Sequence, residues 1–594
     1  MFFKIRYLFL CWTLLALQSV AAHATLPLQG SWNGFLNQTN IVECHNLSIR
    51  QADSLLLTLF RNDGSELGSI PFQLNARGTA HLILNSFPIT NGYGTFTVDS
   101  NSSSTEKNLQ INCHTAVYRL GDQASLGKAV EYAFALESSG DLHGSASGIF
   151  NSINPDGERK PVLNWLSLAN NSAEPFSAQI LLYNQDGSIN HPASFRVTQL
   201  QPKERRDFAL GHPLGQIVGL YSIVPDNAVQ PYRAFNTRYG LKENGYRFAF
   251  TLSASEGVAQ PHPLVASTMD PATNWLEVAN VSEAMVTVMV QIKDQAGALR
   301  FERELQVEPF GQKHINVNSY LGERNLGSAT ARVLGAGRIL FQSLYYGRLP
   351  NRPQTEWAYA SQASGSAATI NSKVVNSINT HLGAANWNIF INNNSDNGAL
   401  DLKYFATDGV LSAERTTSLP FSGSTAYGVH QDVGADFIGQ GIATSFESGA
   451  SFSSELLRVF PHQSGGLGYI MRLPSVVVPP SSSAEAYFRF TADGDFIIKL
   501  TDPARIAEAR EILRDPTKPN RHVMGRVVPS RVNYNANWSY HLDPSSIVFF
   551  ELSTEVCDAS LSYLQQNLDQ LGTSFLPGSI FCPWSSRLVE EIIY

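Results

Sequence analysis

Short runs in which apolar and polar residues alternate fill most of the chain, and this period of two is typical of half-buried β-strands. One run recurs: Asn-Trp-Leu-Ser-Leu-Ala-Asn at residues 164–170 returns as Asn-Trp-Leu-Glu-Val-Ala-Asn at 274–280, and more loosely as Asn-Trp-Asn-Ile-Phe-Ile-Asn at 386–392. The tryptophans are 110 and 112 residues apart. A second alternating run and a turn, such as Asp186-Gly187, follow each recurrence, which predicts a hairpin.

Later parts of each unit repeat as well. A Leu-x-Pro or Val-x-Pro element, a strand that contains glycine and a closing strand follow in order, and two closing strands end at Tyr239-Gly240 and Tyr346-Gly347. The first unit shows the same order, with Cys44-His45-Asn46-Leu47 in place of the Asn-Trp-Leu element and a closing strand that starts at Cys113. A period near 110 residues with about seven strands favours a β-sandwich over a solenoid repeat or a propeller blade.

We therefore predict a mainly β, multidomain chain in which four tandem β-sandwich repeats, with cores laid end to end, precede a small disulfide-linked α+β domain. The predicted units are residues 25–125, 126–240, 241–350 and 351–475, followed by a Pro- and Ser-containing linker at 476–485 and the α+β domain at 486–594.

The repeated tryptophans have two interpretations. Trp165, Trp275 and Trp387 are expected to point between the two sheets of each sandwich; the alternative is that the indoles are exposed and stack on a ligand. The flanking asparagines are expected to hydrogen-bond loop backbone rather than a sugar.

The N-terminus has the order of a secretory signal peptide. Residues 1–24 begin with Lys4 and Arg6, continue through an apolar run from Leu8 to Leu17 and finish at Ala22-His23-Ala24, a site for signal peptidase. Later segments fall short of the ~18 apolar residues of a membrane helix. We expect a secreted or periplasmic protein without a membrane span.

Charge and cysteine count narrow the picture further. Removal of the signal changes the net charge from −8 to −10, which argues against a nucleic-acid partner. Four cysteines then remain, an even number that predicts disulfides in an exported protein. Three pairings are open, and the local one, Cys44 with Cys113 and Cys557 with Cys582, is favoured because each pair lies inside one predicted domain.

The pattern changes after the linker. A hairpin centred on Asp493-Gly494 leads into a helix that Thr501 or Asp502 caps and Pro503 opens. A strand over His522–Val528, an aromatic loop, a second strand and a helix from about Ala559 to Leu571 complete the predicted domain.

This segment resembles a known family. The resemblance is carried by Ile-Lys-Leu-Thr-Asp-Pro at 498–503, His-Val-Met-Gly-Arg-Val-Val at 522–528, Trp-Ser-Tyr-His-Leu-Asp-Pro at 538–544, Glu-Val-Cys-Asp-Ala at 555–559, Phe-Leu-Pro-Gly at 575–578 and Cys-Pro-Trp-Ser-Ser-Arg at 582–587. These blocks resemble the amino-terminal domain family named after the calcium-dependent calmodulin-binding protein BP-seventy-four. The resemblance implies a Cys557–Cys582 bridge in an extracellular module, and it implies no particular reaction. Calmodulin binding does not transfer, because the helix after Asp502 carries charges of both signs.

Two candidate sites lie in this domain. One candidate is a metal or acid–base site formed by His522, His541, Asp543 and Asp558, although their spacing matches no ligand pattern. The other candidate is a set of aromatic and arginine side chains, because Trp, Tyr and Arg dominate protein interfaces. The candidate interaction surface consists of Trp538, Tyr540, His541, Arg526, Trp584 and Arg587; the alternative is that Trp538, Tyr540 and Trp584 fill a small core.

The sequence carries no nucleophile elbow, zinc-protease helix, phosphate loop or EF-hand loop in a fitting context, and we expect no cofactor. The leading hypothesis is an exported, non-enzymatic binding protein whose β-sandwiches form a stalk or scaffold that presents the C-terminal module to a protein or glycan partner. The alternatives are a carbohydrate-binding protein, or a C-terminal hydrolase or enzyme inhibitor that uses His522 and His541.

Overall fold

The computed structural model describes residues 26–100, 110–120, 130–138, 141–242, 245–350, 352–365, 367–369, 372–394, 396–445, 451–461, 467–478, 485–515, 517–552 and 555–592. The proposed signal peptide at 1–24 lies outside these residues. Strands dominate the described chain, as predicted. Among the described helices, none combines the length and the apolar character that crossing a membrane requires.

Eight four- or five-stranded sheets form four pairs, and consecutive stretches of the chain supply one pair each. Unit 1 contains β1 (Leu28–Asn33), β2 (Thr39–Asn46), β3 (Ala52–Arg61), β4 (Glu66–Leu74), β5 (Thr79–Ile83), β6 (Tyr93–Ser100), β7 (Ile111–Leu120) and β8 (Val130–Glu137). Unit 2 contains β9 (Ala146–Asn151), β10 (Leu163–Asn170), β11 (Phe176–Asn184), β12 (Phe195–Leu200), β13 (Arg205–Ala209), β14 (Val218–Pro225), β15 (Tyr232–Lys242) and β16 (Gly245–Ser253).

The other two units follow the same plan. Unit 3 contains β17 (Leu264–Ser267), β18 (Ala272–Asn280), β19 (Val286–Asp294), β20 (Leu299–Val307), β21 (Gln312–Asn316), α1 (Asn318–Leu321), β22 (Leu326–Val333), β23 (Ile339–Arg348) and β24 (Thr355–Gln362). Unit 4 contains β25 (Ala368–Thr369), β26 (Lys373–Asn379), β27 (Ala385–Asn392), β28 (Gly398–Ala406), β29 (Leu411–Leu419), β30 (Ser424–Gly428), α2 (His430–Val433), β31 (Ile438–Thr444), β32 (Ser451–Pro461), β33 (Leu467–Leu473) and β34 (Val476–Val478).

Each unit has its own hydrophobic core between its two sheets. In unit 2, Leu166 and Leu168 of one sheet pack with Ile180 and Ile223 of the other, and all four side chains are buried. Comparable clusters fill units 1, 3 and 4. The repeat in the sequence therefore reflects separate sandwich interiors.

The predicted unit boundaries at 125/126, 240/241 and 350/351 are wrong, because each falls before the last strand of its unit. β8, β16 and β24 pair with the preceding β7, β15 and β23. The Tyr-Gly pairs that were expected to end units 2 and 3 mark instead a close approach: a Cβ at Gly240 would lie 2.2 Å from the ring of Phe248 on the next strand.

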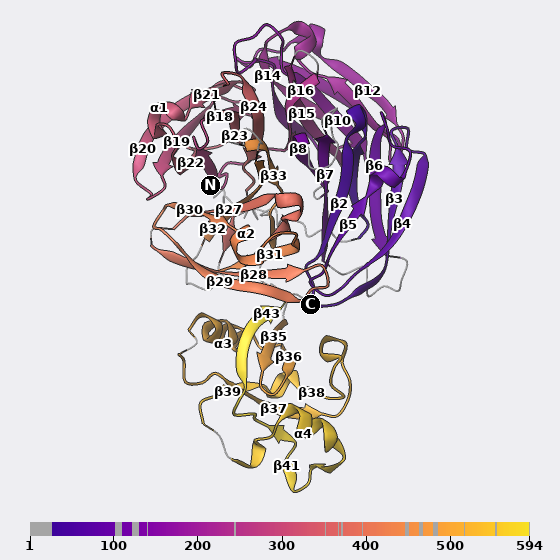
Figure 1. Cartoon of the computed structure of the whole chain (residues 1–594), viewed down its shortest axis with the longest axis vertical. Helices are drawn as coiled ribbons and strands as arrows, with labels where there is room; N and C mark the ends of the chain where they lie inside the picture. Colours follow the sequence, from indigo (N-terminus) through magenta and orange to yellow (C-terminus); the bar gives the residue numbers. More distant parts are fainter. Residues whose placement is uncertain are drawn as a thin grey trace, which may run out of the picture.

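The units do not form the predicted string but close into a ring (Figure 1). The last full strand of each unit contacts that of the next: β8 meets β16, β16 meets β24, β24 meets β33, and β33 returns to β8. A cavity of about 290 Å³ lies where these strands converge, with Phe134, Phe250, Tyr359 and Met471 among its lining residues. Unit 4 thus contacts unit 1, and each of the four units has a neighbour on both sides.

A second set of contacts runs around the ring through the hairpin turns. The turn of each unit accepts a backbone hydrogen bond from the neighbouring unit: Asn62 from Arg205, Gln185 from Gln312, Gln295 from Ser424 and Thr407 from Thr79. The glycines of these turns, at 64, 187, 297 and 409, have φ between 83° and 88°. They leave no room for a side chain; a Cβ on Gly187 would lie 2.0 Å from the carbonyl oxygen of Pro309 in unit 3.

The repeated tryptophans do not point between the sheets, so that prediction is wrong. Because side chains alternate along a strand, Leu166 and Leu168 face the interior of unit 2 and Trp165 faces outward. Trp165 packs on a cluster that includes Phe134 of unit 1, and Trp275 and Trp387 pack in the same manner at the following two contacts between units. All three indoles are half-buried between units rather than between sheets.

The asparagines hydrogen-bond loop backbone, as predicted, but the predicted alignment of the first unit with the repeated element is corrected. The second asparagine of each repeat donates its amide to the carbonyl four residues later: Asn170 to Glu174, Asn280 to Ala284 and Asn392 to Asp396. Asn46 does the same to Arg50. Asn46 is therefore the last residue of the element, which begins at Asn40 and not at Cys44.

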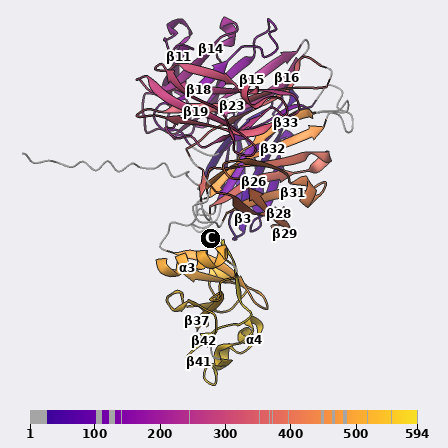
Figure 2. The ribbon, with the colours of Figure 1, turned by 90° about the vertical axis from the view of Figure 1, so that its left-hand side faces the viewer.

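The C-terminal domain is mixed α and β, as predicted. It contains β35 (Ala486–Thr491), β36 (Asp495–Leu500), α3 (Pro503–Arg514), β37 (His522–Val528), β38 (His541–Leu542), β39 (Val548–Phe550), α4 (Leu561–Gln566), β40 (Leu571–Gly572), β41 (Phe575–Pro577), β42 (Ile580–Phe581) and β43 (Arg587–Ile592). Asp502 caps α3 by accepting from the N–H of Ala504. The domain lies outside the ring (Figure 2), and Val476–Val478, expected to start the linker, form β34 on unit 4 instead.

Candidate functional site

The C-terminal domain is attached to the ring through two residues of its last strand, Glu590 by its carboxylate and Glu591 by its backbone carbonyl. Glu590 accepts from Arg77 of unit 1 at 2.6 Å and from Arg489 of its own domain at 2.9 Å, and Lys403 of unit 4 lies 4.0 Å away. Lys373 of unit 4 donates to the backbone carbonyl of Glu591. Burial opposes ionisation of Glu590, but the surrounding cations hold the pKa of its carboxyl well below the ordinary value. This attachment spans the junction of units 1 and 4.

Strands β35, β43 and helix α3 face the ring, whereas β41 and α4 lie at the far end of the domain (Figure 1). The end of the domain that contains β41 and α4 therefore points away from the ring (Figure 1). The described residues of the ring lie on the other side of the domain, which leaves this surface open to solvent (Figure 1, Figure 2).

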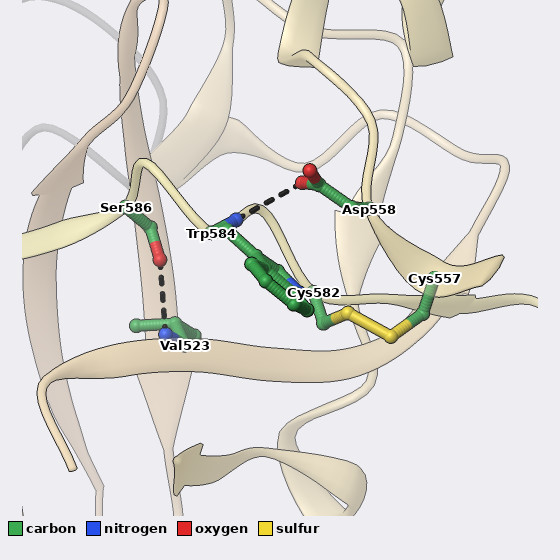
Figure 3. Close-up of a disulfide and its surroundings, with 6 residues drawn as sticks. All are labelled: Val523, Cys557, Asp558, Cys582, Trp584 and Ser586. Atoms are coloured by element: carbon green, nitrogen blue, oxygen red, sulfur yellow. Dashed lines mark hydrogen bonds between the residues drawn. A yellow bond between two sulfur atoms is a disulfide. The ribbon is translucent and has the colours of Figure 1, made fainter. Parts of the chain in front are cut away.

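A disulfide holds two loops of this surface together. Cys557 is bonded to Cys582, the N–H of Cys582 donates to the carbonyl of Cys557 at 2.8 Å, and the N–H of Trp584 donates to Asp558 at 3.0 Å (Figure 3). The buried hydroxyl of Ser586 accepts from the N–H of Val523 on β37. The second predicted disulfide, Cys44–Cys113, joins β2 to β7 in unit 1.

Large apolar side chains are exposed around the Cys557–Cys582 bridge. Trp584 is 41% exposed and Val556 is 67% exposed. Leu552, 79% exposed, comes two residues after Phe550, which packs on the disulfide. Arg526 and Arg587 are exposed on β37 and β43. We call Leu552, Val556, Trp584, Arg526 and Arg587 the disulfide surface.

Three residues of the predicted interaction surface have other roles. Tyr540 is completely buried against Phe496 and donates its hydroxyl to Leu561, so it belongs to the core and not to a surface. Trp538 is half-buried, and its indole N–H donates to the carbonyl of Asp495. His541 is bound through Nδ1 to the carbonyl of Ser530.

The metal or acid–base group predicted in this domain is not assembled. His522 contacts the carbonyl of Ser586, and His541 that of Ser530. Asp543 caps a turn by accepting from Ser545, and Asp558 accepts from Trp584. Each side chain is therefore used in a separate structural hydrogen bond. Among the described residues, the metal-ligating side chains that do cluster belong to a different group.

That group, which the sequence reasoning missed, lies where unit 4 closes on unit 1. Ligand atoms of Glu43, His45 and His114 lie within 4.8 Å of one another, and all three residues are buried. Glu43 is, however, already paired: Arg458 of unit 4 donates to both of its oxygens, at 2.7 and 3.0 Å, and Ser377 also donates to it. A guanidinium in this position repels a cation, so the cluster acts as a buried ion pair between units.

The electrostatics of the cluster agree with this assignment. Burial opposes ionisation of Glu43, but Arg458 holds the pKa of its carboxyl well below the ordinary value. Burial also lowers the pKa of His45 and His81, which keeps both imidazoles neutral. The same design recurs between units 2 and 3, where Arg238 pairs with the buried Glu277 at 3.0 Å. The equal placement of these glutamates in their repeats, three residues after the first asparagine, is the signal that could have revealed them.

Comparison with known proteins bears on the last part of the chain. Residues 484–593 match the BP-seventy-four N-terminal domain. This agrees with the resemblance inferred from the ordered motifs. No curated protein matches the chain. The BP-seventy-four-type domain is thus the part that carries the disulfide surface, and the ring lies outside the match.

Proposed function

We propose that the protein is an exported, non-enzymatic binding protein in which a ring of β-sandwiches holds a BP-seventy-four-type domain and presents its disulfide surface to a protein partner. The observation that carries the proposal is the exposure of Leu552, Val556 and Trp584 around one disulfide. Large apolar side chains exposed to water are unfavourable for an isolated domain, and a group of them in one region is typical of a contact site.

Two further features support this proposal. Arg526 and Arg587 add exposed guanidinium groups, which can donate several hydrogen bonds to a partner's carboxylates or carbonyls. The two disulfides are compatible with an oxidising, extracellular or periplasmic compartment. The stalk expected from the sequence is replaced by a ring, so the scaffold is closed rather than extended.

The test compares two exposed aromatic residues of the same domain. The full-length protein and its Trp584→Ala and Tyr563→Ala variants are immobilised and exposed to extracellular extracts, and captured proteins are identified and their affinities measured. We expect Trp584→Ala to weaken the affinity of the captured partner at least 10-fold, because a buried interface tryptophan is worth about 2 kcal/mol or more. Tyr563, 54% exposed on α4, is the matched control and should have no effect.

Equal capture by both variants would contradict the proposed surface. Turnover of a peptide, ester or glycoside by the purified protein, abolished by a single substitution, would contradict the non-enzymatic assignment.

A further inference from the structure

A pocket lies between units 1 and 2, on the ring and separate from the C-terminal domain. It has a volume of about 280 Å³, at the lower end of the range of small-molecule sites. Unit 1 and unit 2 both line it, and the lining residues are Asn33, Phe35, Leu36, Tyr93, Trp165, Arg205, Asp207, Thr237, Tyr239 and Tyr246. Trp165, the first of the three repeated tryptophans, is among them.

Aromatic faces form much of this lining. Phe35, 36% exposed, and Tyr93 stack at 5.1 Å between ring centroids. Trp165 and Tyr246 are half-buried, so part of each ring remains accessible. Rings held in this way offer flat apolar platforms with little conformational freedom to lose on binding.

The polar groups of the pocket are held in fixed positions. Arg205, 1% exposed, lies 5.0 Å over the ring of Tyr93 and donates to both oxygens of Asp207, at 2.9 and 2.8 Å. It also donates across the unit contact to the carbonyl of Trp32 at 2.8 Å. Arg205 is therefore a positioning residue that orients the Asp207 carboxylate, whose remaining lone pairs can accept further hydrogen bonds.

The combination of groups defines the ligand. Arg205 and Asp207 neutralise each other, so the pocket has no net charge to attract an ion. The amide of Asn33, which donates to the hydroxyl of Tyr239 at 3.2 Å, is a second ordered polar group in the lining. A neutral ligand with one apolar face and several hydroxyl groups at its edge matches stacked aromatic rings beside this amide and the Asp207 carboxylate. A pyranose ring has this character, since its axial C–H bonds form a face and its hydroxyls lie around the rim.

Three contacts between units contain a repeated tryptophan, and among them the first alone has the full set of groups. At the other two contacts, the position equivalent to Tyr93 holds Val218 and Leu326. Each of these three residues comes directly before the first glycine of its strand, β6, β14 or β22. Arg205 and Asp207 are replaced by Gln312 and His314 in unit 3 and by Ser424 and Ala426 in unit 4. The equivalent tryptophans thus provide internal controls.

We propose that the pocket between units 1 and 2 binds a neutral saccharide, with Trp165 stacking on a pyranose face and Asp207 accepting from its hydroxyls. This goes beyond the proposed role of the disulfide surface and does not depend on it. The ring then has a ligand site of its own.

The experiment uses the full chain on an array of neutral oligosaccharides of glucose, galactose, mannose and N-acetylglucosamine, followed by calorimetric titration with the best binder. We expect Trp165→Ala and Asp207→Asn to weaken that affinity at least 10-fold. Trp275→Ala, which removes the same indole at the next contact between units, should leave the affinity unchanged. The near-ultraviolet circular dichroism spectrum of Asp207→Asn, recorded without ligand, should match that of the parent protein. A match shows that the loss of affinity comes from a lost contact and not from a lost fold.

Absence of binding to every array member would overturn the proposal. Equal loss of affinity in Trp165→Ala and Trp275→Ala would also overturn it, because the two tryptophans share their structural role but not the pocket. Both results are independent of partner capture by the disulfide surface.

Discussion

Two glutamates, Glu43 and Glu277, are fully buried where units meet, each beside an arginine of the preceding unit in the ring. A buried pair contributes little net stability compared with apolar residues, but loss of one partner leaves an uncompensated charge. The consequence can be measured at Arg458.

Arg458→Met is expected to lower the free energy of unfolding by about 3–5 kcal/mol, because it leaves Glu43 buried without its cation. Urea titration followed by intrinsic fluorescence measures the change. The double variant Glu43→Gln/Arg458→Met should recover much of the loss. Arg338→Met, which breaks an exposed pair with Glu256, is the matched control with an effect below about 1 kcal/mol. Similar losses for the two arginines would contradict the role assigned to burial.

The same cluster predicts a pH dependence. Burial lowers the pKa of His45 and His81 below the ordinary value of 6.5, so the unfolded chain binds protons that the folded chain does not. Stability should therefore fall as the pH decreases below about 6.5, with a further loss below about 4.5 as the unfolded chain takes up protons on Glu43 and Glu277. The groups that face these imidazoles are Glu43, His114 and Arg458.

Calorimetric melting temperatures at pH 7.5 and 5.5 check the sign. His45→Gln/His81→Gln should reduce the difference without abolishing it, because burial also lowers the pKa of His262, to about 4. A melting temperature that rises on acidification would refute this explanation.

At the scale of single elements, the turns that join neighbouring units are the most sensitive part of the fold. Gly187→Ala must accept both a left-handed conformation and a collision with Pro309 of unit 3. Gly157 has a similar φ, 71° against 88°, and nothing within 4 Å of a Cβ. We expect Gly157→Ala to cost about 1 kcal/mol and Gly187→Ala to cost a further 1–3 kcal/mol, measured by urea titration.

Equal costs at the two glycines would mean that the contact between units contributes nothing. A Gly187→Ala variant as stable as the parent protein would have the same meaning.

Element types were largely predictable, and their partners were not. Alternation and Asp-Gly turns identify hairpins because side-chain direction and turn geometry are local properties. When both faces of a strand are apolar, the sequence does not show which face meets the core of its own unit. Leu166 and Trp165 lie on opposite faces of such a strand, and this explains why the prediction placed the indoles in the core. The sequence assigns the eighth strand of units 1, 2 and 3 to the following unit, because only the pairing of that strand, and no local signal, shows to which unit it belongs.

At the scale of the whole molecule, the period of the sequence indicates how many similar domains to expect. It does not indicate whether the first and last of these domains contact each other. A string and a ring have the same repeat. The difference lies in pairs such as Glu43 and Arg458, 415 residues apart, which no local pattern connects. The C-terminal domain was more accessible to prediction because its motifs are contiguous, yet the exposure of Trp584 and the burial of Tyr540 depend on packing.

The pairing of Glu43 with Arg458 has a consequence for synthesis. At about 5–20 residues per second, a ribosome that has made Glu43 needs roughly 20–80 s to reach its partner. During that interval the first sandwich holds a carboxylate without its counter-ion, and Tyr118 of β7 and Ala133 and Ala135 of β8 lack the unit 4 residues that cover them in the ring. The nascent protein therefore passes through a long stage in which it is prone to aggregate, and only the arrival of the fourth sandwich ends it.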